Sequence, residues 1–300
     1  MKRILFSLWT FLLSLGAQEV ITQPATLKGN IFTEGATWQQ LSSGHAGCEG
    51  AQWITESGTP TLYYAAHHDL LAYKWTAKGG LVTWRSDSPE ATSFRPDGQG
   101  GYYVVEQKNR RLVRWNKKAQ VSEVLADRFD GKMLSRPNDV RVKSDGTIWF
   151  TDPPFLFKKR TNEVKELDKD YVFRYNPKTK KLTAVIDELK FPNGIAFSPD
   201  EKYLFIGAAG TLYRWAVSQS GELSNKQALA TKVKGLDGLT FGPQGRLWAC
   251  SLKSIILFDT EGQKLGEIKT PNKPTSIAFS TEAKLVSITM RDSCYIVKLK

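Results

Sequence analysis

Residues 137–150 read PNDVRVKSDGTIWF, and the phrase returns in altered form as PNGIAFSPDEKYLFI at 192–206 and LDGLTFGPQGRLWA at 236–249. Each copy consists of a polar residue, a short apolar run, a turn and a second apolar run. Short apolar runs separated by Pro, Asp and Gly are typical of β-strands joined by tight turns. A phrase repeated every fifty residues or so, at about the spacing of known β repeats, indicates a fold built from copies of one β unit.

Six such units can be laid along the chain. They start at Glu49, Ala91, Asn138, Asn193, Asp237 and Ser276. Most units add a third, aromatic-rich run, such as LVRW at 112–115, and a fourth, such as LTAVI at 182–186. Four short strands in a unit of roughly forty residues are typical of a propeller blade. We therefore predict an all-β fold, a six-bladed β-propeller with four-stranded antiparallel blades, forming a single domain over residues 18–300.

The N-terminal residues have the pattern of a secretory signal peptide. Lys2 and Arg3 precede a predominantly apolar stretch of 12 residues, Ile4–Leu15, and small residues follow at Gly16-Ala17. This order predicts a signal peptide over residues 1–17 and a secreted or periplasmic protein. The apolar run is too short to span a bilayer comfortably and no other segment is apolar enough, so we expect no membrane insertion of the mature chain. Residues 18 to about 33 are expected to supply a strand that closes the ring.

The charge balance is strongly basic, with 42 Lys and Arg against 30 Asp and Glu and a formal net charge of +12. The positive residues are scattered, and no nucleic-acid-binding motif accompanies them, so a solvated basic surface is expected and no nucleic-acid partner. We expect a monomer or a weak oligomer.

The three cysteines, Cys48, Cys250 and Cys294, have no CxxC spacing, which disfavours a zinc site built from thiolates. In an exported protein, one disulfide with a leftover thiol is an open alternative.

Four of the six unit starts carry side-chain oxygen: Glu49, Asn138, Asn193 and Asp237. In a propeller, the first residues of the innermost strands converge at the mouth of the central channel. Two carboxylates and two amides there would form a set of hard oxygen ligands, which favours Ca²⁺, Mg²⁺ or Mn²⁺ over Zn²⁺. Asn-Gly and Asp-Gly pairs are also common turns, but four copies in register favour one divalent metal site.

Several stretches carry a family resemblance. Residues 125–154, which include LADRFDGKMLSRPNDV and IWFTDPP, are the most specific, and 192–200, 237–248 and 106–111 add to them. Through these stretches the chain resembles the senescence-marker-protein/regucalcin/gluconolactonase family of six-bladed propellers, especially its bacterial gluconolactonase-like branch. The resemblance covers roughly residues 45 to 300.

The resemblance implies a metal-dependent lactonase that hydrolyses a sugar lactone such as gluconolactone to the free acid. It implies Glu49, Asn193 and Asp237 as metal ligands, Asn138 as a residue facing metal or substrate, and Asp237 also as general base. The family commonly holds Ca²⁺ or Zn²⁺, and with these oxygen ligands we expect Ca²⁺ above the others. A small-molecule lactone is the expected partner.

Two pocket positions depart from the family pattern, and one segment is inserted. AAHHD at 65–69 and EATS at 90–93 replace polar positions of the family, so His67 or His68 is a candidate substitute contact to substrate. The polar insertion at 153–169 is expected to cover one end of the axis. Alternative interpretations are a metal-stabilised binding or sensing propeller without turnover, and an esterase on the same scaffold.

Overall fold

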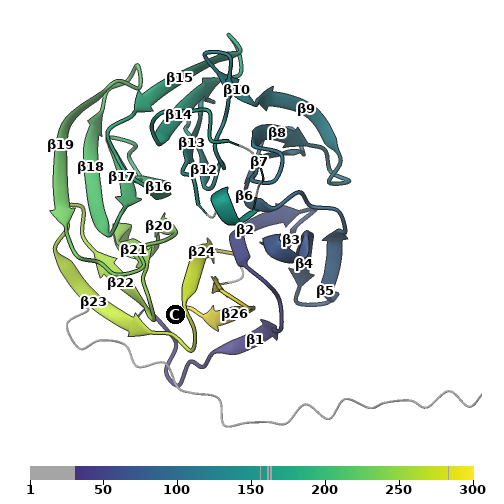
Figure 1. Cartoon of the computed structure of the whole chain (residues 1–300). Helices are drawn as coiled ribbons and strands as arrows, with labels where there is room; N and C mark the ends of the chain where they lie inside the picture. The colour runs from purple at the N-terminus through teal and green to yellow at the C-terminus, as the bar shows by residue number, and fades with distance from the viewer. Residues whose placement is uncertain (1–30, 156, 161, 163, 283) are drawn as a thin grey trace, which may run out of the picture.

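The computed structural model describes residues 31–155, 157–160, 162, 164–282 and 284–300. These residues form six four-stranded antiparallel sheets arranged as a ring (Figure 1), so the predicted six-bladed β-propeller is confirmed. The predicted signal peptide, residues 1–17, lies outside the described residues.

Each blade runs outward from its first strand. Blade 1 consists of β2 (Cys48–Glu56), β3 (Thr59–Ala66), β4 (Leu71–Thr76) and β5 (Gly80–Arg85), and blade 2 of β6 (Ala91–Pro96), β7 (Tyr102–Glu106), β8 (Arg111–Trp115) and β9 (Val121–Ala126). Blade 3 consists of β12 (Val140–Val142), β13 (Ile148–Asp152), β14 (Tyr171–Asn176) and β15 (Lys181–Ile186), and blade 4 of β16 (Pro192–Phe197), β17 (Tyr203–Ala208), β18 (Thr211–Val217) and β19 (Leu223–Ala230). Blade 5 consists of β20 (Leu239–Phe241), β21 (Leu247–Cys250), β22 (Ser254–Phe258) and β23 (Lys264–Lys269).

Blade 6 closes the ring with strands from both ends of the chain. It consists of β24 (Pro274–Ser280), β25 (Leu285–Met290), β26 (Ser293–Lys298) and, on the outside, β1 (Gln39–Ser42). Gln39 pairs with Ile296, and an isolated bridge joins Phe32 to Leu299. The N-terminal segment therefore does close the ring, but the closing strand lies after the segment 18 to about 33 that the sequence indicated.

The apolar core is divided among the six interfaces between neighbouring blades. Each of six buried clusters draws its residues from two adjacent blades, because a sheet can bury both faces only against the sheets beside it. Aromatic edge-to-face pairs cross several of these interfaces. The ring centroids of Trp149 and Phe197 lie 5.4 Å apart between blades 3 and 4, and those of Trp248 and Phe279 lie 5.0 Å apart between blades 5 and 6.

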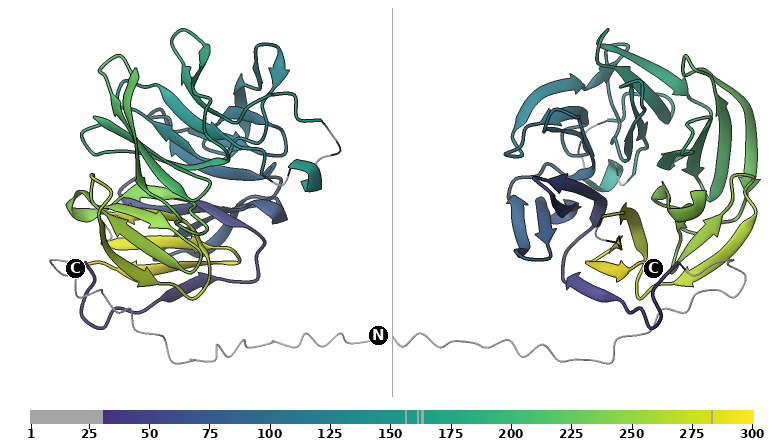
Figure 2. Two further views of the ribbon diagram at one scale, coloured as in Figure 1. Left: turned by 60° about the vertical axis from the view of Figure 1, so that its left-hand side comes forward. Right: turned by 180° about the vertical axis from the view of Figure 1, so that it is seen from behind.

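The remaining elements are short. They are the hairpin β10 (Arg128–Phe129) and β11 (Lys132–Met133), the 3₁₀ turns η1 (His67–Asp69) and η2 (Pro243–Gly245), and one helical turn, α1 (Phe157–Arg160). The turn α1 belongs to the 153–169 insertion and lies in front of the centre of the ring in Figure 1; Figure 2 shows it standing out from that face. Within the described residues, no helix has the length and apolar character needed to cross a membrane.

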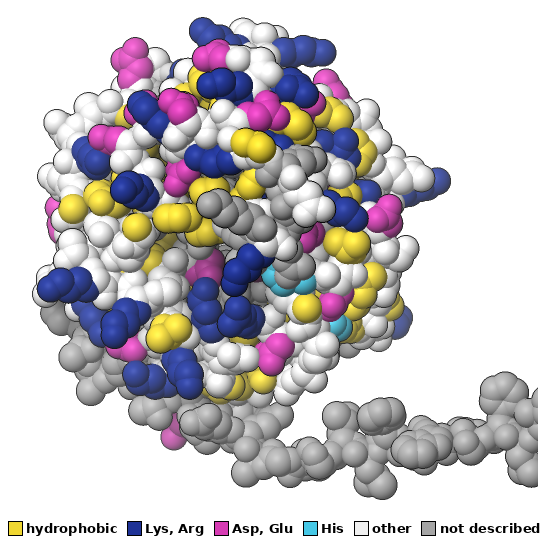
Figure 3. All heavy atoms as spheres, in the orientation of Figure 1, with side chains coloured by type: hydrophobic (Ala, Val, Ile, Leu, Met, Phe, Trp, Pro, Cys, Tyr) yellow, Lys and Arg dark blue, Asp and Glu magenta, His cyan; other side chains and the backbone are white. Residues whose placement is uncertain are grey.

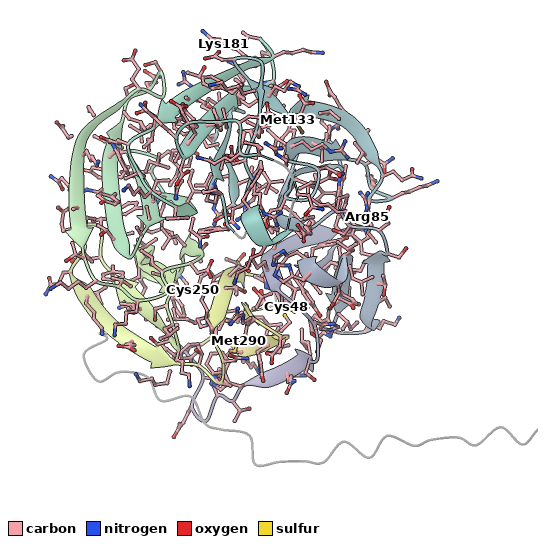
Figure 4. All side chains as sticks on the ribbon, viewed as in Figure 1. Cys48, Arg85, Met133, Lys181, Cys250 and Met290 are labelled. Carbon is pink, nitrogen blue, oxygen red and sulfur yellow. The ribbon has the colours of Figure 1, made fainter. Side chains whose placement is uncertain are left out.

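All three cysteines are buried free thiols, so the disulfide that the sequence left open is not formed. Cys48 belongs to blade 1 and Cys250 to blade 5, and both are labelled in Figure 4. Cys294 packs in the same apolar cluster as Cys48. Burial raises the pKa of the Cys48 thiol to about 12, which keeps it protonated and unreactive at neutral pH.

Candidate functional site

The first strands of the six blades surround the axis, and each contacts the first strand of the next blade. Together they enclose a narrow cavity. Its lining includes all four oxygen-bearing residues aligned from the sequence: Glu49, Asn138, Asn193 and Asp237. The repeat phrase thus places four blades' polar residues in one cavity.

Irregular strand pairing occurs beside two of these residues, Glu49 and Asn193. The register of β2 against β3 shifts between Glu49 and Gln52, and that of β16 against β17 shifts between Pro192 and Ile195. Such bulges bend a strand and re-aim its side chains, and they are common beside functional sites. Asn193 is therefore part of a bulged strand, and the interpretation of Asn-Gly as a turn entering the strand is wrong here.

Glycines beside the polar residues allow the blades to approach closely. A Cβ on Gly194 would lie 2.2 Å from the carbonyl oxygen of Asp237, and one on Gly238 would lie 2.4 Å from that of Thr275. Neither glycine has a positive φ, so the backbone conformation would accept another residue. Glycine is required at both positions because there is no space for a Cβ atom. The glycines of the Asn-Gly and Asp-Gly pairs therefore allow neighbouring inner strands to lie in close contact.

Glu49 sits in a crowded electrostatic environment. Burial and then the nearby Asp237 carboxylate raise the pKa of Glu49 well above its ordinary value, while Lys273 opposes this shift. His67 lies behind it, with Nε2 3.8 Å from Glu49 Oε1. A Cβ on Gly47 would lie 2.4 Å from the His67 ring, so this glycine makes room for the histidine.

Asp237 has one close partner, the ammonium of Lys273. The Lys273 Nζ donates to Asp237 Oδ2 at 2.7 Å. Burial lowers the pKa of Lys273, but the Asp237 carboxylate outweighs burial and raises it, so the lysine is charged. The sequence analysis did not identify Lys273, which precedes β24 and comes from the next blade.

The two asparagines have amide side chains that are free to bind a ligand. Their backbones are held: Asn138 N donates to Thr151 O at 2.8 Å, and Asn193 O accepts from Thr151 Oγ1 at 2.8 Å. No hydrogen bond from another described residue reaches either side-chain amide, although both line the cavity. Rigid backbones with uncommitted amides are suited to orienting a ligand.

Arg95 and Arg141 lie farther along β6 and β12 than the oxygen-bearing residues at the unit starts. We call the part of the cavity that these arginines line its inner end and the part lined by Glu49 and Asp237 its outer end. The inner end also holds Asp139, and Arg141 Nη1 donates to Asp139 Oδ1 at 2.6 Å. Arg95 Nη2 lies 3.8 Å from the same carboxylate oxygen. Two guanidiniums at this depth disfavour a cation here and leave the outer end, with Glu49 and Asp237, as the candidate cation site.

Residues 48–289 match the family model for the SMP-30/gluconolactonase/LRE-like region. The chain belongs to this family. A gluconolactonase of Zymomonas mobilis is 27% identical over 256 residues, covering 76% of this chain and 71% of that protein. The lactonohydrolase oryL of Aspergillus oryzae is 25% identical over 186 residues, covering 53% of this chain and 43% of that protein.

Solved structures show the same relationship. A gluconolactonase from Xanthomonas campestris has a TM-score of 0.84 at 28% identity, covering 94% of this chain and 95% of that one. The calcium-binding regucalcin of Agrobacterium tumefaciens has a TM-score of 0.73 at 16% identity, covering 91% of this chain and 96% of that one, and so shares the fold.

Two segments, 65–69 and 90–93, depart from the family pattern. The first contains His67, and the second contains Glu90, which forms a buried ion pair. Glu90 Oε2 accepts from Arg136 Nη2 at 2.7 Å, and both side chains are almost fully buried. Ala91 is buried away from the cavity, and Thr92 lines it in its place. His67 is buried and is not among the cavity-lining residues; its Nε2 lies 3.8 Å from Glu49 Oε1, and its role as a substrate contact stays a prediction.

The donor set and the size of the cavity fit one divalent cation. The cavity volume is about 20 Å³, which is room for one ion or one water molecule. Among the described residues, no group of three or more His, Cys, Asp or Glu side chains could hold a metal. A cation here would therefore use the Glu49 and Asp237 carboxylates with asparagine oxygens or water, a set of hard ligands suited to Ca²⁺.

Proposed function

We propose that this protein is a metal-dependent lactone hydrolase whose active site is the outer end of the axial cavity. The observation that carries the proposal is the convergence of Glu49, Asn138, Asn193 and Asp237 in one cavity, in a chain of this family. The names of its relatives, a gluconolactonase and a lactonohydrolase, support a lactone as substrate. Aldonolactones such as gluconolactone are the substrates we expect.

The cavity itself is too small for a sugar lactone, so the substrate would lie at its mouth. A divalent cation bound by Glu49, Asn193 and Asp237 would supply positive charge that polarises the lactone carbonyl and stabilises the developing oxyanion. Asn138, with its uncommitted amide, would orient a substrate hydroxyl.

Asp237 is the proposed general base. Its carboxylate would accept a proton as a water molecule attacks the carbonyl carbon, and the ring C–O bond would then break, with the departing ring oxygen taking that proton from Asp237 to give the hydroxy acid. A carboxylate is a weak base, which suffices for a strained ester such as a lactone and would not suffice for an amide. We also propose that the protein is exported, as the predicted signal peptide over residues 1–17 indicates.

Acid release from glucono-1,5-lactone in a pH-stat tests this proposal. Protein supplied with Ca²⁺ or Zn²⁺ should accelerate acid release, a chelator should abolish the acceleration, and Asp237→Asn should lower kcat by at least about 100-fold. Asp87→Asn, which removes an exposed carboxylate outside the cavity, is the matched control and should retain the rate.

If the metal-loaded protein hydrolyses no lactone in a panel, the proposal is wrong. Ester hydrolysis without lactone hydrolysis would instead support an esterase on this scaffold, and ligand binding without turnover would support a binding propeller.

A further inference from the structure

Lys273 contacts the cavity-lining residue Asp237 from the loop that precedes β24. Its backbone is anchored, because Lys273 N donates to Asn272 Oδ1 at 2.7 Å and Lys273 O accepts from Arg291 N at 3.0 Å. Its side chain is 29% exposed, whereas the Asp237 side chain that it contacts is 10% exposed. The ammonium therefore lies between the buried carboxylate and solvent on a flexible stem that can move.

The cavity already holds its own cations. Glu49, Asp139 and Asp237 line it with Arg95 and Arg141, and Lys273 pairs with Asp237. Asp139 is paired with the two arginines at the inner end, so Lys273 is the cation that offsets Glu49 and Asp237 at the outer end. A divalent ion added to this set, with all three carboxylates ionised, would leave an excess of two positive charges.

Two consequences follow from these pairings. An ion that uses Asp237 Oδ2 as a ligand must displace the Lys273 ammonium from that oxygen, and an ion bound only at Oδ1 would be repelled by the adjacent ammonium. Once displaced, that ammonium would have no other carboxylate of the cavity to pair with, because Glu49 would also be bound and Asp139 is held by arginines. An uncompensated cation at the mouth would favour a negatively charged ligand.

We propose that Lys273 releases Asp237 when a divalent cation binds, and that the released ammonium selects lactones bearing a carboxylate group. The substrate class is then an acidic sugar lactone, and Lys273 is a specificity-determining residue. This inference rests on the proposed lactonase function, and it adds that the neutral gluconolactone is the poorer substrate.

The surface around blade 5 is also positively charged and so favours a negatively charged ligand. A groove of about 540 Å³ beside blade 5 is lined by one carboxylate, Glu267, and by the lysines Lys232, Lys234, Lys253, Lys264 and Lys269. In Figure 3 dark-blue side chains gather over the region of β19 and β23 and near the centre of the ring. Such a field attracts anionic substrates toward the face that carries the cavity mouth.

The first test measures metal binding and needs no turnover. Ca²⁺ is titrated calorimetrically into the metal-free wild type, Lys273→Met and Lys273→Arg, with Lys118→Met, an exposed lysine outside the cavity, as control. Lys273→Met should bind Ca²⁺ at least tenfold more tightly, about 1.4 kcal/mol, because competition and repulsion are both removed. Lys273→Arg and the control should remain within threefold of wild type. Equal Ca²⁺ affinity in wild type and Lys273→Met, or no Ca²⁺ binding to either, overturns the proposal that Lys273 releases Asp237 when the cation binds.

The second test measures selectivity. The ratio of kcat/KM for a glucaric acid lactone, which carries a carboxylate, to that for glucono-1,5-lactone should exceed one in the wild type. Lys273→Met should lower this ratio at least tenfold, mainly through KM of the acidic lactone, and Lys273→Arg should preserve it within threefold. A ratio unchanged in Lys273→Met overturns the specificity role. If the wild type hydrolyses neither lactone, the lactonase proposal and the specificity role of Lys273 fail together. The calorimetry still decides whether Ca²⁺ displaces Lys273 from Asp237.

Discussion

Replacing Gly194 with alanine tests the close approach of inner strands on which the site depends. The added Cβ would lie 2.2 Å from the carbonyl oxygen of Asp237 and 2.8 Å from the amide nitrogen of Leu239. Both are backbone atoms, which no side-chain rotation can move away. Since ordinary contact begins at 3.4 Å, blades 4 and 5 must separate locally by about 1 Å. Overpacking of this kind costs about 1–3 kcal/mol, and we expect the upper end because backbone must move.

The same displacement moves Asp237 relative to Asn193, its proposed co-ligand. A shift of about 1 Å in a catalytic constellation can lower the rate by about 100-fold. Gly194→Ala should therefore lose metal affinity and lactone turnover as well as stability.

Urea unfolding followed by tryptophan fluorescence measures the stability change. Gly79→Ala is the control, because its Cβ would meet only the Thr76 hydroxyl, at 2.9 Å, in an exposed turn. We expect the control to stay within about 0.5 kcal/mol of wild type. A Gly194→Ala protein that matches this control in unfolding free energy and binds metal as wild type does would refute the reasoning about strand contact.

Three further predictions concern burial and processing. Burial raises the pKa of Asp152 to about 7 from an ordinary 3.8, opposed by backbone N–H groups of Ser135 and Arg136; the native state therefore keeps a proton that the unfolded state loses. Stability should fall by up to about 4 kcal/mol as pH rises from 4 to 7, and Asp152→Asn should flatten this profile in urea unfolding. Arg136→Met should cost about 3–5 kcal/mol because it removes the buried guanidinium that pairs with the buried Glu90 carboxylate, and adding Glu90→Gln should recover part of the loss. N-terminal sequencing of the exported protein should read from Gln18, whereas a retained Met1 would contradict the predicted signal peptide.

The architecture could be predicted from the sequence because each blade repeats one phrase. The innermost strands fall where the units start, since local alternation and turn residues encode a blade without reference to distant contacts. The closing strand β1 was harder to place, because an outer strand defined by pairing with Tyr295 and Ile296 carries no repeat signal of its own.

The candidate site could be predicted only in part, for the same physical reason. Glu49, Asn138, Asn193 and Asp237 share a position in the repeat, so alignment alone brings them together. Lys273 acts across 36 residues from a loop between blades, and an ion pair over that separation leaves no pattern in the sequence. Arg136 and Glu90 likewise meet between blades, 46 residues apart.

The central claim is that the outer end of the axial cavity binds one divalent ion that lactone hydrolysis requires. The most direct test is a titration of metal-free protein with Ca²⁺ or Zn²⁺ while acid release from a lactone is recorded in a pH-stat. We predict that activity rises linearly and saturates at one ion per chain, and that Glu49→Gln needs a much higher metal concentration. Full activity in the metal-free protein, or a rise that Glu49→Gln leaves unchanged, would contradict the claim.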